Sequence, residues 1–198
     1  MPKIPPPQEP HAIPPESAPD DGGAPGHANG PATPPQPGGF HNWAWWLGVV
    51  AVLIAFDHAV KLWAVSELAP RLFDPTLPDS IPIIPGLFRL TYAENTGAAF
   101  SLLDGRVGFL AIVSAVATIA LTYWWTRIPK EESLGRAGVA LVLAGTVGNL
   151  IDRAFRGFVV DMFDAYYRGY SWPVFNVADS LICVGVGILI LRTLQGKI

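Results

Sequence analysis

The sequence predicts a mainly α-helical integral membrane protein with four transmembrane helices. Three observations predict this class. The chain contains four long apolar runs, and its residues are 51% hydrophobic. Charged residues make up only 15% of it, against roughly 25% in a typical soluble domain. Tryptophan and tyrosine gather at the ends of two runs, as they do at the surfaces of a membrane.

Residues 1–40 precede the first apolar run and differ from it in composition. Thirteen of the 20 prolines lie there, together with several glycine pairs and very few large apolar residues. Such a segment cannot bury enough apolar surface to offset the entropy of ordering its backbone. We therefore expect a disordered Pro-rich tail at 1–40 and a four-helix membrane domain at 41–198.

The four runs approach the roughly 20 apolar residues that a membrane helix needs. The first opens with the interfacial residues Trp43, Trp45 and Trp46, and the second contains no charge. The third is uncharged until it is extended by Asp152 and Arg153. We expect the spans at 43–68, 107–125, 137–151 and 174–194.

An even number of spans places both chain ends on the same side of the membrane. The short link between the second and third spans carries Arg127, Lys130 and Arg136. The other loops also contain arginines, but the basic residues are densest in this link, which the positive-inside rule assigns to the cytoplasm. We expect cytoplasmic termini, with the loops 69–106 and 154–173 on the outer face.

Both outer loops contain apolar stretches that are too short to span a membrane. Residues 81–92 form a stretch interrupted by prolines, which predicts one or two short strands at the membrane surface. The second loop is rich in aromatic residues and contains the apolar segment 158–163.

Two aspartates lie where a charge is expensive. A charged side chain at membrane depth costs roughly 2.5–3.5 kcal/mol even on lenient scales. Asp179 lies about five residues into the fourth span, roughly 8 Å from its start. Asp161 lies in an apolar stretch of the second outer loop. Both acids belong to the same side of the membrane, so their carboxylates can meet at one end of the helix bundle.

Two carboxyl groups that share a site of low dielectric cannot both ionise cheaply, so one of them keeps its proton near neutral pH. The pair then holds a base that can activate water and an acid that can polarise a carbonyl, which is what peptide hydrolysis needs. A structural alternative remains open. Asp161 can cap a loop, and Asp179 can cap the start of the fourth span.

Other polar residues in the runs have structural and functional readings. Asp57 and Lys61 lie four residues apart in the first span and can pair, with Lys61 snorkelling toward the interface. Asp57 can also bridge to another helix or support the site. Asn95 has the sequence of a turn, and its amide can also donate a hydrogen bond to a substrate backbone.

The end of the third span combines small and polar residues. Gly145 and Gly148 permit close helix approach. Asn149, Asp152 and Arg153 follow them, and we expect these three to brace the outer loop.

Several chemistries are excluded by the residues present. The one cysteine, Cys183, allows neither an internal disulfide nor a thiolate metal cluster. No histidine lies in a HExxH pattern, and no GxSxG motif is present. The net charge is −3 and no Lys/Arg-rich tract exists, so a nucleic-acid partner is not expected. We expect neither a metal nor a cofactor.

Four stretches together resemble the bacterial lipoprotein signal peptidases, also called signal peptidase II. They match in order and spacing, and the resemblance covers about 43–194. The stretches are 57–61 (DHAVK), 95–101 (NTGAAFS), 145–153 (GTVGNLIDR) leading to 157–161 (GFVVD), and 175–179 (FNVAD).

The resemblance implies an aspartyl endopeptidase whose catalytic dyad is Asp161 and Asp179. Its substrates are diacylglyceryl-modified prolipoproteins, cleaved just before the lipidated cysteine. It implies a multi-pass protein of the bacterial cytoplasmic (inner) membrane, in contact with membrane lipids, with its active site toward the extracytoplasmic face. The family fold adds a small extracytoplasmic β-cradle and a short interfacial helix, and we expect a monomer. Supporting or substrate-contacting roles are implied for Asp57, Lys61, Asn95, Gly97, Asn149, Asp152, Arg153, Asn176 and Ala178.

Two other classes of function remain as alternatives. A small proton-coupled transporter would use intramembrane acids as a relay, which requires a polar path across the whole bilayer. The acids here gather toward one end, and the second span has none. A non-catalytic assembly or lipid-binding protein would tolerate replacement of Asp161 and Asp179 by asparagine.

Overall fold

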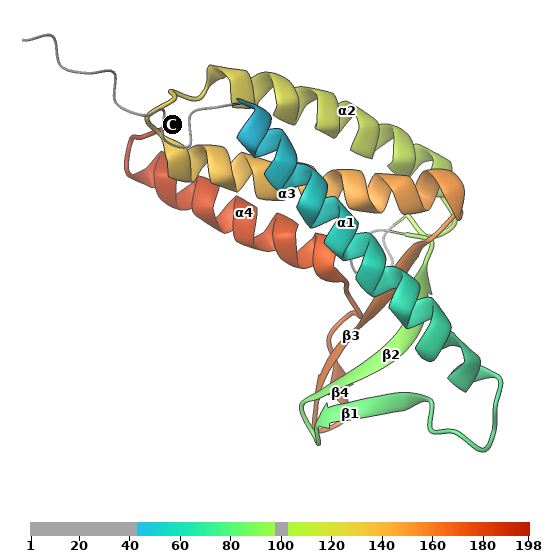
Figure 1. The fold of residues 1–198 in the computed structure, drawn as a ribbon. Coiled ribbons are helices and arrows are strands. Elements are labelled where there is room, and N and C mark those ends of the chain that lie inside the picture. Colours follow the sequence, from blue (N-terminus) through green and yellow to red (C-terminus); the bar gives the residue numbers. More distant parts are fainter. Residues whose placement is uncertain (1–42, 98–102) are drawn as a thin grey trace, which may run out of the picture. The chain divides into compact units, whose positions relative to one another are not determined.

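The computed structural model describes residues 43–97 and 103–198. Four helices in these ranges are long and apolar enough to cross a membrane, which confirms the predicted class. They form the upper part of the molecule in Figure 1. The predicted tail, 1–40, lies outside the described residues. The helices are α1 (Trp43–Glu67), α2 (Val107–Arg127), α3 (Ser133–Phe155) and α4 (Val177–Leu194).

Helix α3 lies at the centre of the bundle, because it packs against each of the other three helices. It has by far the largest number of buried residues of the four. Helix α2, in contrast, buries only Leu110 and exposes apolar side chains such as Ile112 and Ile119. An apolar helix with so little protein contact is suited to lipid, since lipid can cover the side chains that the protein leaves exposed.

Close contact between α3 and its neighbours depends on two glycines. A Cβ atom added at Gly145 would lie 2.3 Å from the carbonyl oxygen of Ala178 in α4. One added at Gly148 would lie 2.7 Å from Oδ2 of Asp57 in α1. The predicted close approach at both positions is therefore confirmed.

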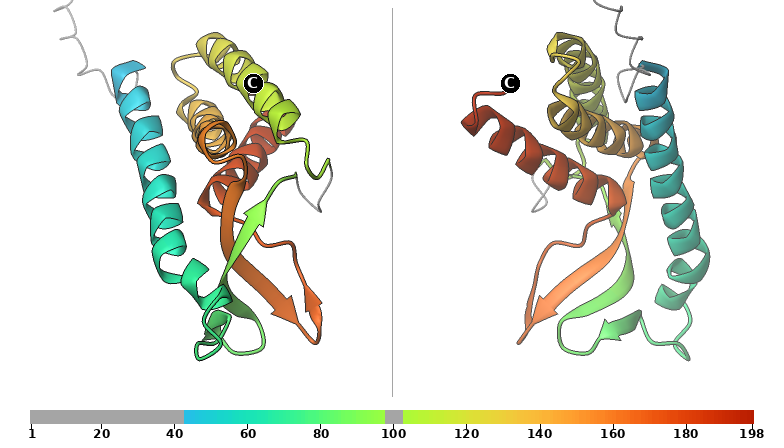
Figure 2. Two further views of the ribbon diagram at one scale, coloured as in Figure 1. Left: turned by 90° about the vertical axis from the view of Figure 1, so that its right-hand side faces the viewer. Right: turned by 60° about the vertical axis from the view of Figure 1, so that its left-hand side comes forward.

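The two outer loops combine into one antiparallel sheet below the bundle. Strand β2 comes from the first loop and pairs with β3 from the second, with Ala93 opposite Asp161. Figure 2 shows that the strands leave the ends of the helices and extend away from them beside the end of α1. A four-residue 3₁₀ helix, η1 (Ala69–Leu72), follows α1. In the order β1-β2-β3-β4, the strands are Ser80–Ile84, Phe88–Asn95, Val159–Tyr167 and Tyr170–Ser171.

Helix caps move two of the predicted boundaries. Helix α3 begins at Ser133 rather than 137, because the side chain of Glu132 accepts a hydrogen bond from the backbone N–H of Gly135. Helix α4 begins at Val177 rather than 174, because Asn176 caps it. Asp179 therefore lies in the first turn of α4, and the predicted depth of five residues inside the span is wrong.

Candidate active site

Asp161 is held in the middle of the sheet with only 1% of its surface exposed. Its strand, β3, is buried over this stretch, because Val160 and Met162 pack against the end of α1. One carboxylate oxygen accepts a hydrogen bond from Nδ2 of Asn95 at 2.9 Å. The other accepts one from Nδ2 of Asn176 at 2.6 Å. Each oxygen thus accepts a hydrogen bond from a side-chain amide.

Asp179 caps the start of α4 and also accepts a hydrogen bond from another helix. Its backbone N–H donates to Oδ1 of Asn176 at 2.9 Å, and its Oδ2 accepts from the backbone N–H of Asn176 at 3.3 Å. This reciprocal pair is a capping box, so the helix-capping alternative is correct for Asp179. Its Oδ1 accepts a hydrogen bond from Nδ2 of Asn149 at 2.8 Å and is not used by the cap. The cap therefore orients the carboxyl group through Oδ2 and leaves Oδ1 to accept from Asn149.

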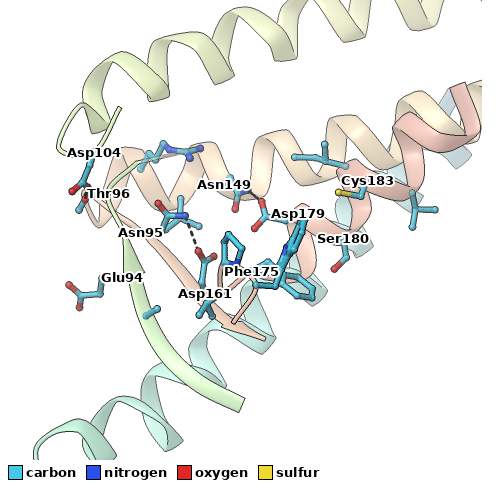
Figure 3. Close-up of a pocket in the computed structure, with 18 residues that line it drawn as sticks. Glu94, Asn95, Thr96, Asp104, Asn149, Asp161, Phe175, Asp179, Ser180 and Cys183 are labelled. Carbon is cyan, nitrogen blue, oxygen red and sulfur yellow. Dashed lines mark hydrogen bonds between the residues drawn. The ribbon is translucent and has the colours of Figure 1, made fainter. Parts of the chain in front are cut away.

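Asn176 joins the two aspartates. Its Nδ2 donates to Asp161 while its Oδ1 accepts from the backbone of Asp179, so one side chain contacts both residues. Asn176 is completely buried, and its Nδ2 also lies 3.2 Å from Oδ1 of Asn149. Figure 3 shows Asp161 on the strand and Asp179 at the start of the helix, both among the residues that line the pocket.

Both carboxyl groups line a pocket of about 1010 Å³. Its polar wall includes Asn95 and Arg153 beside the two acids. Its apolar wall follows α4 and the segment before it, and includes Trp172, Phe175 and Ile182. A bound molecule can therefore place a polar group against the two acids and an apolar group along the helix.

The surroundings of Asp161 favour its protonated form. Burial, reinforced by the negative charge of Asp179, raises the pKa of Asp161 to about 7. The hydrogen bonds from Asn95 and Asn176 act in the opposite direction but are outweighed. A carboxyl group with this pKa is partly protonated at neutral pH, which is the condition for one member of an acid pair to act as a donor.

Behind the pocket, Lys61 is fully buried between three polar partners. Its Nζ lies 2.8 Å from Oδ2 of Asp57, 3.0 Å from Oδ2 of Asp152 and 3.0 Å from Oδ1 of Asn149. The expectation that Lys61 snorkels is wrong, because these acceptors satisfy its ammonium group in place. Asp57 does reach another helix, as expected, since its Oδ1 accepts from the backbone N–H of Ala178 at 2.9 Å.

Asp152 and Arg153 at the end of α3 contact the outer loops, as predicted, whereas the contacts of Asn149 are made with α1 and the start of α4 instead. Oδ2 of Asp152 accepts from the backbone N–H of Val160 at 3.3 Å. The guanidinium of Arg153 donates to the carbonyl oxygen of Gly97 at 3.1 Å, so the buried Gly97 takes part through its backbone. Asn95 also forms the predicted turn, because its Oδ1 accepts from the backbone N–H of Gly97 at 2.9 Å.

Sequence reasoning missed a second buried acid of strand β3, Asp164, which is only 2% exposed. Its Oδ2 accepts from Nε of Arg89 at 2.6 Å, and its Oδ1 accepts from the hydroxyl of Ser171. The signal was present, because Asp164 follows Asp161 by three residues in the same apolar stretch. An odd spacing places the two acids on opposite faces of a strand, and Asp164 is not among the residues that line the pocket. Asp164 therefore joins the strands of the sheet.

Sequence reasoning also missed Arg156, which pairs with Asp152, one of the partners of Lys61. Its Nε lies 3.2 Å from Oδ1 of Asp152, on the side away from Lys61. Among the described residues, no group of three or more His, Cys, Asp or Glu side chains is placed to hold a metal ion.

Comparison with known proteins identifies one family consistently. The family model for signal peptidase (SPase) II matches residues 49–195. The lipoprotein signal peptidase of Geobacter metallireducens is 43% identical over 154 residues, which cover 75% of this chain and 90% of that protein. The lipoprotein signal peptidase of Actinobacillus succinogenes is 45% identical over 154 residues, covering 76% of this chain and 88% of that protein.

A solved structure has the same fold. It is a bacterial membrane enzyme determined by the in meso method at 2.3 Å resolution. The TM-score is 0.66 at 30% sequence identity, and the match covers 77% of this chain and 89% of that one. The likeness therefore includes most of the solved enzyme.

Proposed function

The chain belongs to the signal peptidase II family of aspartic peptidases, which remove signal peptides from prolipoproteins, and from this premise we propose that Asp161 and Asp179 are its catalytic dyad. One observation carries the proposal. The two aspartates line one pocket and share a single buried partner, Asn176. Carboxyl groups held at a common site by neutral donors can exchange a proton without a metal ion.

The chemistry requires one ionised and one protonated carboxyl group. The ionised member accepts a proton from a water molecule, which attacks the carbonyl carbon of the scissile bond. The protonated member donates its hydrogen bond to the carbonyl oxygen as negative charge develops there. When the C–N bond breaks, the leaving amine takes a proton from the pair, which returns to its starting state. The raised pKa of Asp161, about 7, supports a shared proton at neutral pH.

We propose that the substrate is a diacylglyceryl-modified prolipoprotein, cleaved just before the lipidated cysteine. The shape of the pocket supports this class. The two acids lie at the end of the membrane helices, where a lipid-anchored cysteine would lie. Apolar residues of α4, such as Ile182 and Val184, continue the pocket from Asp179 along the helix, in the direction that acyl chains would take.

The supporting residues act on the site through contacts of three kinds. Asn95 and Asn176 donate to Asp161, and Asn149 donates to Asp179. Gly97 and Ala178 contribute backbone groups, because the first accepts from Arg153 and the second donates to Asp57. Lys61 and Asp152 lie behind these residues.

We place the protein in the bacterial inner membrane with cytoplasmic termini and the dyad toward the extracytoplasmic face. The basic residues Arg127, Lys130 and Arg136 around the α2–α3 link support this orientation. We expect a monomer, because among the described residues both aspartates and their hydrogen-bond donors come from the same chain. The Pro-rich tail, 1–40, has no part in the proposed chemistry.

Cleavage of a diacylglyceryl-modified prolipoprotein peptide in detergent tests this function. We expect the wild type to cut before the lipidated cysteine. Asp161→Asn and Asp179→Asn, checked for folding, should each lose about 10⁴-fold in kcat, as single replacements in other catalytic units do. Asp164→Asn is the matched control, because it alters a buried acid of the same strand outside the pocket.

Each outcome identifies a different error. Near-wild-type cleavage by folded Asp161→Asn or Asp179→Asn would refute the dyad. A wild type that cleaves the unlipidated peptide equally well would refute the lipidated substrate class. Loss of cleavage in folded Asp164→Asn would show that any buried acid of the sheet has the same effect.

A further inference from the structure

Lys61 is a buried cation that the proposed chemistry does not use. Its side chain is completely inaccessible, and it does not line the pocket. A bound substrate therefore cannot contact it. Burying an ammonium group is costly unless acceptors surround it, and here they come from Asp57 on α1 and from Asn149 and Asp152 on α3.

One of these contacts decides which way an amide points. The amide of Asn149 has one accepting oxygen and one donating nitrogen, whereas an ammonium group can only donate. Lys61 therefore requires Oδ1 of Asn149 on its own side, at 3.0 Å. The nitrogen is then left to face Asp179, to which it donates at 2.8 Å. Without Lys61, Asn176 is the one remaining described donor to that oxygen.

The same cluster reaches the backbone beside each aspartate. Asp152 accepts from Lys61 and from the backbone N–H of Val160, the residue before Asp161. Asp57 accepts from the backbone N–H of Ala178, the residue before Asp179. The two segments that carry the dyad are thus attached to one group of charges.

We propose that Lys61 is a positioning residue for the catalytic dyad, fixing the amide of Asn149 toward Asp179 and holding the segments of Asp161 and Asp179 in register through Asp152 and Asp57. This inference rests on the proposed function of the two aspartates. It assigns Lys61 an effect on the rate of the chemical step, although the side chain touches neither substrate nor dyad.

The charge of Lys61 also acts on the dyad directly. It lowers the pKa of Asp161 against the larger opposing effects of burial and Asp179. Removing it should raise that pKa, so the alkaline limb of the pH–kcat profile should move to higher pH. The charged groups around the pair are Asp57 and Lys61 from α1, Glu94 from β2, Asp152 and Arg153 from α3, and Asp104 at the pocket wall.

The test compares Lys61→Met with Arg89→Met on the diacylglyceryl-modified peptide in detergent. Arg89→Met is a matched control, because it also removes a cation from a buried acid, Asp164, but at a place with no described contact to the dyad. Lys61→Met should lower kcat about 10- to 100-fold, as small misplacements of catalytic groups do, with little change in KM. Arg89→Met should lose thermal stability but keep kcat and the pH profile per folded molecule.

Lys61→Met leaves the buried carboxylates of Asp57 and Asp152 without the cation they share, and the variant can fail to fold for that reason. A second variant keeps the test decisive in that case. The double replacement Asp57→Asn with Lys61→Met removes one charge of each sign and leaves Asp152 paired with Arg156. It should show the same fall in kcat with a smaller alkaline shift, because losing the negative charge of Asp57 opposes the effect of losing Lys61. A wild-type kcat and an unshifted profile in the folded double variant would overturn the inference. The asparagine variants of Asp161 and Asp179 test the dyad separately, so the two failures are distinguishable.

Discussion

The two ends of the helix bundle each contain a buried cation, but they satisfy it differently. Arg136, near the α2–α3 link, is 5% exposed and donates to the carbonyl oxygens of Ile128 at 2.9 Å and Pro129 at 3.2 Å. Its guanidinium also lies 4.6 Å from the ring centre of Trp125. Lys61, at the end next to the sheet, is enclosed by two carboxylates and an amide.

The difference shows how a buried charge becomes coupled to a site. The partners of Arg136 are carbonyls at the end of a neighbouring helix and an aromatic face, and none of them changes charge. Two partners of Lys61 are carboxylates, and the third, Asn149, donates a hydrogen bond to Asp179. Losing any member of this network therefore alters the surroundings of the others. Changes near Arg136 should therefore affect stability alone, whereas changes near Lys61 should affect catalysis as well.

The largest contrast should come from adding one methyl group to α3 at either end. Gly145→Ala at the site end would place Cβ 2.3 Å from a backbone oxygen of α4, which cannot move without displacing Asp179. We expect cleavage to be lost, with a destabilisation of about 1–3 kcal/mol or more from overpacking. Cleavage activity and thermal melting in detergent measure both effects.

Gly138→Ala is the control at the other end. Its Cβ would lie 3.0 Å from the side chain of Leu189 and 3.1 Å from that of Ile188, so it meets side chains that need to shift by a few tenths of an ångström rather than a backbone oxygen. It should keep most of its activity. Equal loss of cleavage in both variants would contradict the distinction between the two ends.

The next effect in size should be the dependence of cleavage on pH. The pKa of Asp161 is raised to about 7, chiefly by burial and then by Asp179. The proposed chemistry needs one proton on the pair, and a group with this pKa loses it as pH rises, so kcat should fall as pH rises through about 7, by about tenfold for each further pH unit. A pH–kcat profile of the folded enzyme checks this. A rate that stays constant from pH 6 to 9 would show that no carboxylic acid donor is needed.

The smallest effect on activity is expected for Arg136→Met. The variant leaves the carbonyl oxygens of Ile128 and Pro129 without their donor, which should cost about 1–3 kcal/mol of stability. The value of kcat per folded molecule should not change, because no described contact joins Arg136 to the dyad. Thermal melting and cleavage of the same preparation separate the two quantities. A tenfold fall in kcat at full folding would show that the two ends are coupled.

Much of the fold followed from composition and spacing. The four apolar runs form four helices, and the two acids in apolar surroundings, Asp161 and Asp179, line one pocket. The helix starts were less accurate, because hydropathy does not register a cap such as Asn176. The same cap explains why Asp179 lies nearer the helix end than the apolar run indicated.

The surroundings of Lys61 could not be predicted from its own helix. The sequence shows Asp57 four residues away, and this local pair is consistent with a snorkelling lysine. Asn149 lies 88 positions along the chain and reaches Lys61 only because Gly148 allows α1 and α3 to approach closely. Asp164 was missed for a similar reason, since its partner Arg89 comes from a different loop.

The central claim is that Asp161 and Asp179 act as one catalytic unit. The most direct test is the single-turnover rate of cleavage for both asparagine variants and for the double variant. When two residues act together, replacing both lowers the rate little more than replacing one, because the first replacement already removes the function of the pair. We predict that the double variant has the same residual rate as each single variant. Losses that multiply in the double variant would contradict the account, because they would show that the two carboxyl groups contribute independently.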